Sequence, residues 1–156
     1  MLGNELTADG DRPSANSYYT AANKISSGIE SNLLVNGSAP YFIEGLNDSV
    51  QALDAEALGV MYLQDHGETN NAQKVLAYAQ SAFALSGRSI VESSDPATYN
   101  ETYSAAGPFS GFAPYVGTDA PNVIWTEGTS EMLVAAADLG QSTSTLASSL
   151  QARRPG

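Results

Sequence analysis

Residues 124–140, which begin Ile-Trp-Thr-Glu-Gly-Thr and continue as an alanine-rich run to a glycine, decide the fold because they repeat an earlier segment. The earlier segment, residues 53–67, begins Leu-Asp-Ala and also ends at a glycine. In both segments an acid lies 13 residues before that glycine, and Ala-Pro-Tyr precedes the acid, so the repeat extends over 39–67 and 113–140. The copies lie 73 to 74 residues apart. A helical repeat of this length indicates supersecondary units that bury their faces against one another.

Apolar residues at helical spacing predict four helices and a weaker fifth. These cover about 15–35, 50–65, 70–86, 126–139 and, for the weaker one, 142–152. The second and fourth are apolar over most of their circumference, which predicts burial, whereas the first and third have polar outer faces. Buried helices that alternate with half-exposed ones are typical of an α/α toroid or an α-solenoid, and an irregular helical bundle is the alternative. We therefore expect an all-α fold of antiparallel helical hairpins with short β-hairpin loops.

The remaining segments predict loops and ends. Residues 40–46 are short and aromatic, which predicts an extended segment before a turn at Asn47-Asp48. Residues 88–124 combine glycines and prolines with several aromatic side chains, which indicates a long functional or packed loop. We therefore expect a flexible N-terminal arm at 1–13, one α/α-hairpin domain at 14–152 and a tail at 153–156.

Charge and composition exclude several classes of partner. Six basic residues against 17 acidic ones give the 156-residue chain a net charge of −11, which argues against nucleic acid and anionic membrane surfaces as partners. No segment approaches the ~20 apolar residues of a membrane span, so we expect no membrane insertion. Cysteine is absent and no histidine or carboxylate cluster has metal-site spacing, so we expect no metal and no cofactor.

Composition also bears on the cellular location. The chain is rich in Ser, Thr, Asn and Gly and poor in Lys, and it contains three glycosylation sequons, at Asn36, Asn47 and Asn100. Its N-terminus lacks the basic and apolar regions of a signal peptide, so the chain is either cytosolic or a mature form of an exported protein. We expect a secreted or cell-surface protein.

The repeat resembles a known superfamily. Gly-Phe-Ala-Pro-Tyr at 111–115, the Trp-Thr-Glu-Gly-Thr run at 125–129 and the alanine-rich helix that closes at Leu139-Gly140 resemble the inner-helix signature of six-hairpin, (α/α)6-toroid glycosidase-like proteins. The earlier segment from Leu53 to Gly67 resembles it too. The resemblance covers roughly residues 39–140. Six hairpins of this length need about 440 residues, so the chain encodes an incomplete toroid of about two to three hairpins.

The resemblance implies a set of site residues. In that superfamily, acids and aromatic residues at the starts of the inner helices line a carbohydrate-binding funnel. Carried over, Glu127 and Asp54 become candidate catalytic acids of a glycoside hydrolase-like site. The candidate substrate-binding residues are the aromatic side chains Trp125, Tyr115, Phe112 and Tyr41. The structural interpretation also stands, because acids stabilise helix N-termini and aromatic rings pack in cores.

Three other ionisable residues lie on the same predicted helices or at their ends. Glu56 lies on the same helix as Asp54. Glu131 follows Glu127 by four residues, and we expect it to face solvent or a hairpin backbone. His66, the only histidine, is expected to cap the end of its helix.

Two functions from different classes follow. The first is a carbohydrate-active or carbohydrate-binding portion of a six-hairpin glycosidase-like protein that acts on an extracellular glycan. The second is a non-catalytic structural or self-assembly module whose open helical array is completed by other chains or by copies of itself, because an incomplete array exposes apolar ends.

Overall fold

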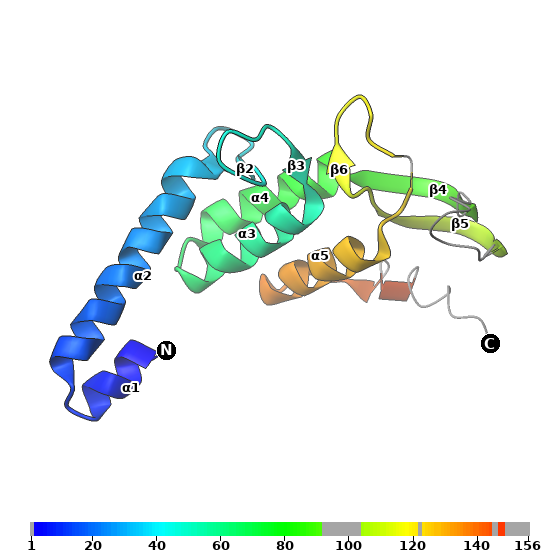
Figure 1. The fold of residues 1–156 in the computed structure, drawn as a ribbon. Coiled ribbons are helices and arrows are strands. Elements are labelled where there is room, and N and C mark those ends of the chain that lie inside the picture. Colours follow the sequence, from blue (N-terminus) through cyan, green and yellow to red (C-terminus); the bar gives the residue numbers. More distant parts are fainter. Residues whose placement is uncertain (1, 92–103, 122, 145–146, 149–156) are drawn as a thin grey trace, which may run out of the picture.

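The structure, a computed structural model, describes residues 2–91, 104–121, 123–144 and 147–148. It consists of a helical body from which a long helix projects (Figure 1). The elements in chain order are α1 (Leu2–Ala8), α2 (Arg12–Asn32), β1 (Leu34–Val35), β2 (Tyr41–Phe42), β3 (Gln51–Ala52), α3 (Leu53–Asp65), α4 (Thr69–Ala82), β4 (Ala84–Val91), β5 (Ser104–Phe112), β6 (Tyr115–Val116) and α5 (Thr126–Asp138).

The fold is helix-rich and mixed rather than all-α. The four strongly periodic segments form α2 to α5, as the sequence predicts, and β1 and β2 form the first short hairpin. The sequence did not predict the longer antiparallel hairpin of β4 and β5, which pairs Ala84 with Phe112 and extends to Val91 with Ser104. This pairing also ends α4 at Ala82, so the prediction of helix up to residue 86 is wrong. The last predicted helix, 142–152, falls partly outside the described residues.

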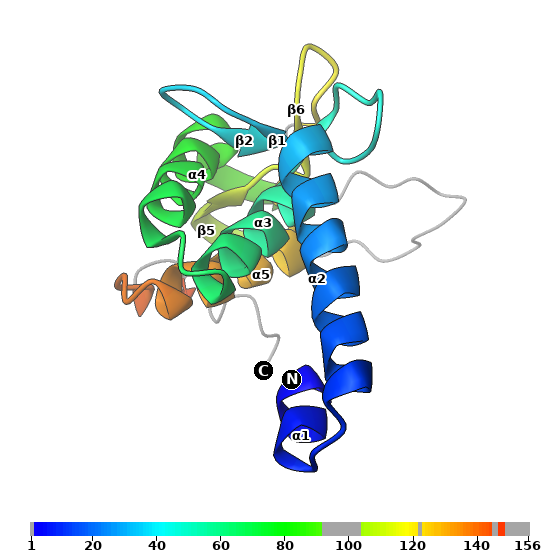
Figure 2. The same ribbon diagram turned by 90° about the vertical axis from the view of Figure 1, so that its left-hand side faces the viewer.

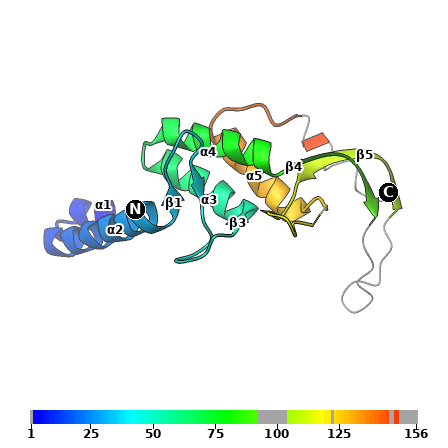
Figure 3. The ribbon, with the colours of Figure 1, turned by 90° about the horizontal axis from the view of Figure 1, so that it is seen from above.

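The helices α3 and α5 lie side by side, and α3 also packs against α4 (Figures 1 and 3). One short segment ties the starts of both helices. The backbone N–H of Leu53, at the start of α3, donates to the Pro114 carbonyl at 2.9 Å. The N–H of Trp125, just before α5, donates to the Phe112 carbonyl at 2.9 Å. The two helices therefore start at the same end of the body.

Both helices also end in the same way. Each contains 13 residues, and each is followed by one residue and then a glycine with positive φ, Gly67 at 79° and Gly140 at 72°. The N–H of the next residue returns to a helix carbonyl, from Glu68 to Leu63 at 2.8 Å and from Gln141 to Ala136 at 2.9 Å. A glycine takes the left-handed conformation that this ending needs without strain.

The core fills the space between α3, α4, α5 and the hairpins. The largest fully buried apolar side chains are Leu53, Val60, Leu63, Val75, Leu76, Phe83 and Met132. Helix α2 reaches this core only near its C-terminal end, through Ile29 and Leu33. Its first half projects away from the body, and α1 folds back along it (Figure 2).

The stretch 1–13, expected as an arm, contains a helix that the sequence did not predict. Helix α1 packs on the start of α2, where the Tyr19 hydroxyl donates to the Asn4 side-chain oxygen at 2.6 Å. Gly3 lies against the Tyr19 ring, and Ala15 is buried. Asp11 caps α2 by accepting from the Ser14 N–H at 3.2 Å. Residues 2–25 therefore form a braced helical hairpin.

Gly59 provides a test of how the first hairpin packs on α3. A Cβ at this position would overlap the Phe42 ring, so we expect Gly59→Ala to destabilise the protein by about 1–3 kcal/mol, the usual cost of overpacking. Gly28, inside α2, is the matched control because nothing lies within 4 Å of its Cβ position. Gly28→Ala should stabilise by up to about 1 kcal/mol through helix propensity. Urea unfolding of both variants checks the difference; equal effects would contradict this packing.

Candidate functional site

Three carboxylates gather where α3 and α5 start. Asp54 is half-buried on α3 and accepts from the Ala55 N–H at 2.9 Å, while Glu127 is exposed on the first turn of α5. Glu131, one turn further along α5, is half-buried, and its Oε2 atom has no hydrogen-bond partner. Burial raises the pKa of Glu131, and the negative charges of Asp54 and Glu127 raise it further. The structure thus places Glu131 close to both predicted acids, a proximity that the sequence did not predict.

The four predicted aromatic residues divide into two groups. Trp125 precedes α5 directly, and its ring covers Gly128, where a Cβ would overlap it. Tyr115 in β6 is exposed, and its hydroxyl donates to the Asp119 carbonyl at 3.1 Å. Phe112 is buried in the core, and Tyr41 stacks on a neighbouring tyrosine, Tyr78, with ring centroids 5.3 Å apart. Only Trp125 and Tyr115 combine some exposure with segments that lead into the start of α5.

The sequence did not predict the buried environment of Glu56, an ionisable residue. Its side chain is fully buried on α3, its Oε2 accepts from the Phe42 N–H at 3.1 Å, and its Oε1 has no partner. Burial raises its pKa from the ordinary 4.5 to about 8, although the Phe42 hydrogen bond opposes the shift. The sequence contains one indication of this burial. The helix that carries Glu56 is apolar on most sides, so it leaves few exposed positions for an acid.

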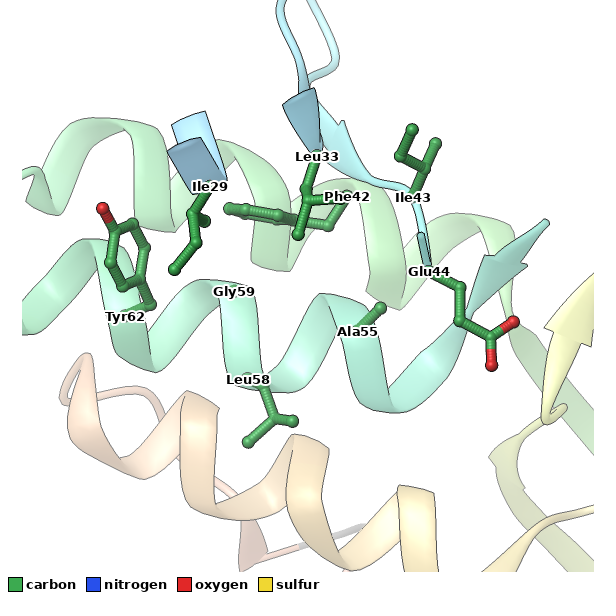
Figure 4. Close-up of a pocket in the computed structure, with 9 residues that line it drawn as sticks. All are labelled: Ile29, Leu33, Phe42, Ile43, Glu44, Ala55, Leu58, Gly59 and Tyr62. Atoms are coloured by element: carbon green, nitrogen blue, oxygen red, sulfur yellow. The ribbon is translucent and has the colours of Figure 1, made fainter. Parts of the chain in front are cut away.

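An apolar groove runs beside α3, on the side where α2 joins the body (Figure 4). Its volume is about 230 Å³, and it is lined by Ile29, Leu33, Phe42, Ile43, Glu44, Ala55, Leu58, Gly59 and Tyr62. The Tyr62 hydroxyl is already engaged, since it donates towards the Glu30 carboxylate at 2.9 Å. Among the described residues that line the groove, Glu44 alone carries a carboxylate, which suits the groove to apolar side chains rather than to polar ligands.

His66 ends α3 as a cap, as the sequence predicts. Its Nδ1 lies 2.8 Å from the Tyr62 carbonyl oxygen, and its Nε2 lies 3.0 Å from the Ser26 hydroxyl of α2. Within the described ranges, no group of three or more His, Cys, Asp or Glu side chains is arranged to hold a metal ion. No helix in the described part of the chain has the length and apolar character needed to cross a membrane.

The raised pKa of Glu56 predicts a pH dependence of stability. A carboxyl with a higher pKa in the folded state stabilises the fold fully below its unfolded pKa of 4.5, and this contribution is lost as pH rises through about 8. The loss is at most about 1.4 kcal/mol per pH unit over that range. Glu56→Gln keeps an oxygen for the Phe42 N–H and removes the titration, so the stability of this variant should vary less between pH 5 and pH 8.

Urea unfolding at several pH values measures this difference. Glu44→Gln, which removes an exposed acid nearby, is the matched control and should keep the pH slope of the unchanged protein. If Glu56→Gln has the same slope as Glu44→Gln, Glu56 is not the buried titrating group.

Comparisons with known proteins leave the function to be argued from this geometry, since no family model, curated protein or solved structure matches the chain.

Proposed function

We propose that this chain is a carbohydrate-binding portion of an α/α-toroid, glycosidase-like protein, and that it binds an extracellular glycan where α3 and α5 start. One observation carries the proposal: the negative charges of Asp54 and Glu127 both act on Glu131. Three carboxylates therefore converge from two helices, beside the half-buried ring of Trp125.

The chemistry of these groups suits a sugar. Ionised carboxylates accept hydrogen bonds from sugar hydroxyls, and the flat faces of Trp125 and Tyr115 offer rigid apolar surface for a pyranose ring. Of the two rings, Tyr115 is the more exposed. Trp125 directly precedes α5, and Tyr115 pairs with Ala52 just before α3. The proposal thus places the sugar across the first turns of α3 and α5.

The same groups would divide the roles that glycoside hydrolysis requires. A general acid must keep its proton near neutral pH, and the raised pKa of Glu131 favours the protonated form. Its proton would pass to the glycosidic oxygen as the glycosidic bond breaks, while the carboxylate of Asp54 or Glu127 would attack the sugar carbon or activate water. This assigns the acid role to Glu131, which the sequence did not favour, and leaves Glu127 and Asp54 as its partners.

The toroid architecture and the export of the protein are parts of this proposal. Helices α3 and α5 would be neighbouring inner helices, with α2 and α4 as outer helices. The position of α3 between α4 and α5, with contacts to both, supports this assignment. A secreted location fits a glycan partner and the composition rich in Ser, Thr and Asn.

Two isosteric variants test the proposed site. Glu127→Gln removes a charge from an exposed first-turn position, so it should weaken glycan binding while stability falls by no more than about 1 kcal/mol. Glu131→Gln removes a partly buried carboxylate that two neighbours repel, so stability should hold or rise while any hydrolysis is lost. A glycan array and a denaturant melt of the same proteins measure both effects.

The control is Glu5→Gln, which changes an exposed first-turn acid on α1, away from the proposed site. It should leave glycan binding unchanged. Binding that survives Glu127→Gln and Glu131→Gln as well as it survives Glu5→Gln would remove the proposed role.

A further inference from the structure

The loop that joins β1 to β2 contains the one Asn-Gly pair of the chain, Asn36-Gly37. Both residues are exposed, and the loop extends beyond the two strands (Figure 2). Nothing lies within 4 Å of the Cβ position of Gly37, so the space around it is open. Because glycine has no Cβ of its own, its backbone nitrogen can approach the side chain of the preceding asparagine without hindrance.

No hydrogen bond holds the groups that would react at this pair. Within the described residues, neither the Gly37 N–H nor the Asn36 side-chain amide has a hydrogen-bond partner. The last pair of the β1–β2 ladder is Val35 with Tyr41, so the loop lies outside the ladder. A backbone nitrogen that donates a hydrogen bond must first give it up before it can react, and Gly37 is spared that cost.

The neighbouring asparagines along the chain are held in place. The side chain of Asn32 donates to a carbonyl of α2 at 2.7 Å, and the N–H of the next residue donates to another α2 carbonyl at 2.8 Å. At Asn47, the N–H of the next residue, Asp48, donates to the Gly45 carbonyl at 3.0 Å. In both places the nitrogen that follows the asparagine is engaged, which sets them apart from Asn36.

We propose that Asn36 is a site of spontaneous deamidation. The Gly37 nitrogen attacks Cγ of Asn36, and a Cγ–N bond to Gly37 forms as the Cγ–Nδ2 bond breaks. Nδ2 leaves as ammonia, taking the proton that the Gly37 nitrogen loses. Water then opens the cyclic imide at either carbonyl, which yields aspartate or isoaspartate. Solvent water is the only co-reactant, and nothing is oxidised or reduced.

The reaction changes both charge and backbone at the end of the first hairpin. A neutral amide becomes a carboxylate, which adds a negative charge to a chain that already carries −11. In the isoaspartate product the main chain runs through the side chain, so it lengthens next to Val35, the last ladder residue of β1. The glycosylation sequon at Asn36 is lost as well, because it requires the amide nitrogen. The reaction needs no enzyme and no glycan, so it is independent of the proposed function.

Incubation of the whole protein at pH 6 and at pH 8, followed by fragment-ion mass spectrometry, tests the proposal. Asn36 should gain about 1 Da, the difference between an amide and an acid, and isoaspartate should appear beside aspartate. The gain should be faster at pH 8, because the attacking nitrogen must lose its proton. Asn32 and Asn47 are internal controls that should react at least about tenfold more slowly. Equal rates at the three asparagines, or an unchanged Asn36, overturn the proposal.

Two glycine variants test which nitrogen attacks. Gly37→Ala places a methyl group in open space, so the fold should hold, but the methyl group hinders the attack and should slow deamidation at Asn36 at least about tenfold. Gly45→Ala is the matched control, because its Cβ would make only an ordinary contact with Asp48 at 3.9 Å. It should leave the rate at Asn36 unchanged. Circular dichroism confirms that both variants fold. If Gly37→Ala deamidates as fast as Gly45→Ala, the Gly37 nitrogen is not the attacking group and the proposal is wrong.

Discussion

Two buried hydrogen bonds between side chain and backbone hold the hairpins on the two central helices. The fourth residue of α3 is Glu56, whose carboxyl accepts the N–H of Phe42 at 3.1 Å. The fourth residue of α5 is Thr129, whose hydroxyl accepts the N–H of Phe112 at 3.1 Å. Buried backbone amides need a partner, so these two side chains fix where each hairpin lies. The apolar groove and the candidate site at the starts of α3 and α5 both depend on these two hydrogen bonds. The Phe42 ring forms a wall of the groove, and the Phe112 carbonyl fixes Trp125 at the start of α5.

The two side chains, Glu56 and Thr129, differ in the electrostatic cost of their burial. The Thr129 hydroxyl accepts from the Phe112 N–H and also donates to the Trp125 carbonyl at 2.6 Å, so its oxygen and its proton are both engaged. Glu56 leaves one buried oxygen without a partner, and its raised pKa favours the neutral carboxyl. A neutral carboxyl costs far less to bury than a charged one. We therefore expect the attachment of the first hairpin to depend on pH.

The features that the sequence predicts are those set by local patterns. Helical periodicity locates α2 to α5, and the matched acid-to-glycine spacing predicts that α3 and α5 end alike at Gly67 and Gly140. The β4–β5 hairpin was missed because its pairing joins residues far apart in the chain, such as Ala84 and Phe112, and glycines and prolines obscured the strand pattern. Asp54 and Glu127 were chosen as candidate acids because they lie at the starts of predicted helices. Their proximity to Glu131 depends on how the two helices pack, and local sequence patterns do not specify that packing.

The acids at the starts of α3 and α5 interact favourably with the helix dipoles, and those at the ends interact unfavourably. Asp54 and Glu127 lie at the starts, where negative charge is stabilising, so helix stability alone accounts for them. Asp65 and Asp138 lie at the ends, where each opposes the dipole by about 0.3–1 kcal/mol. Within the described residues no cation lies in either last turn to offset that cost.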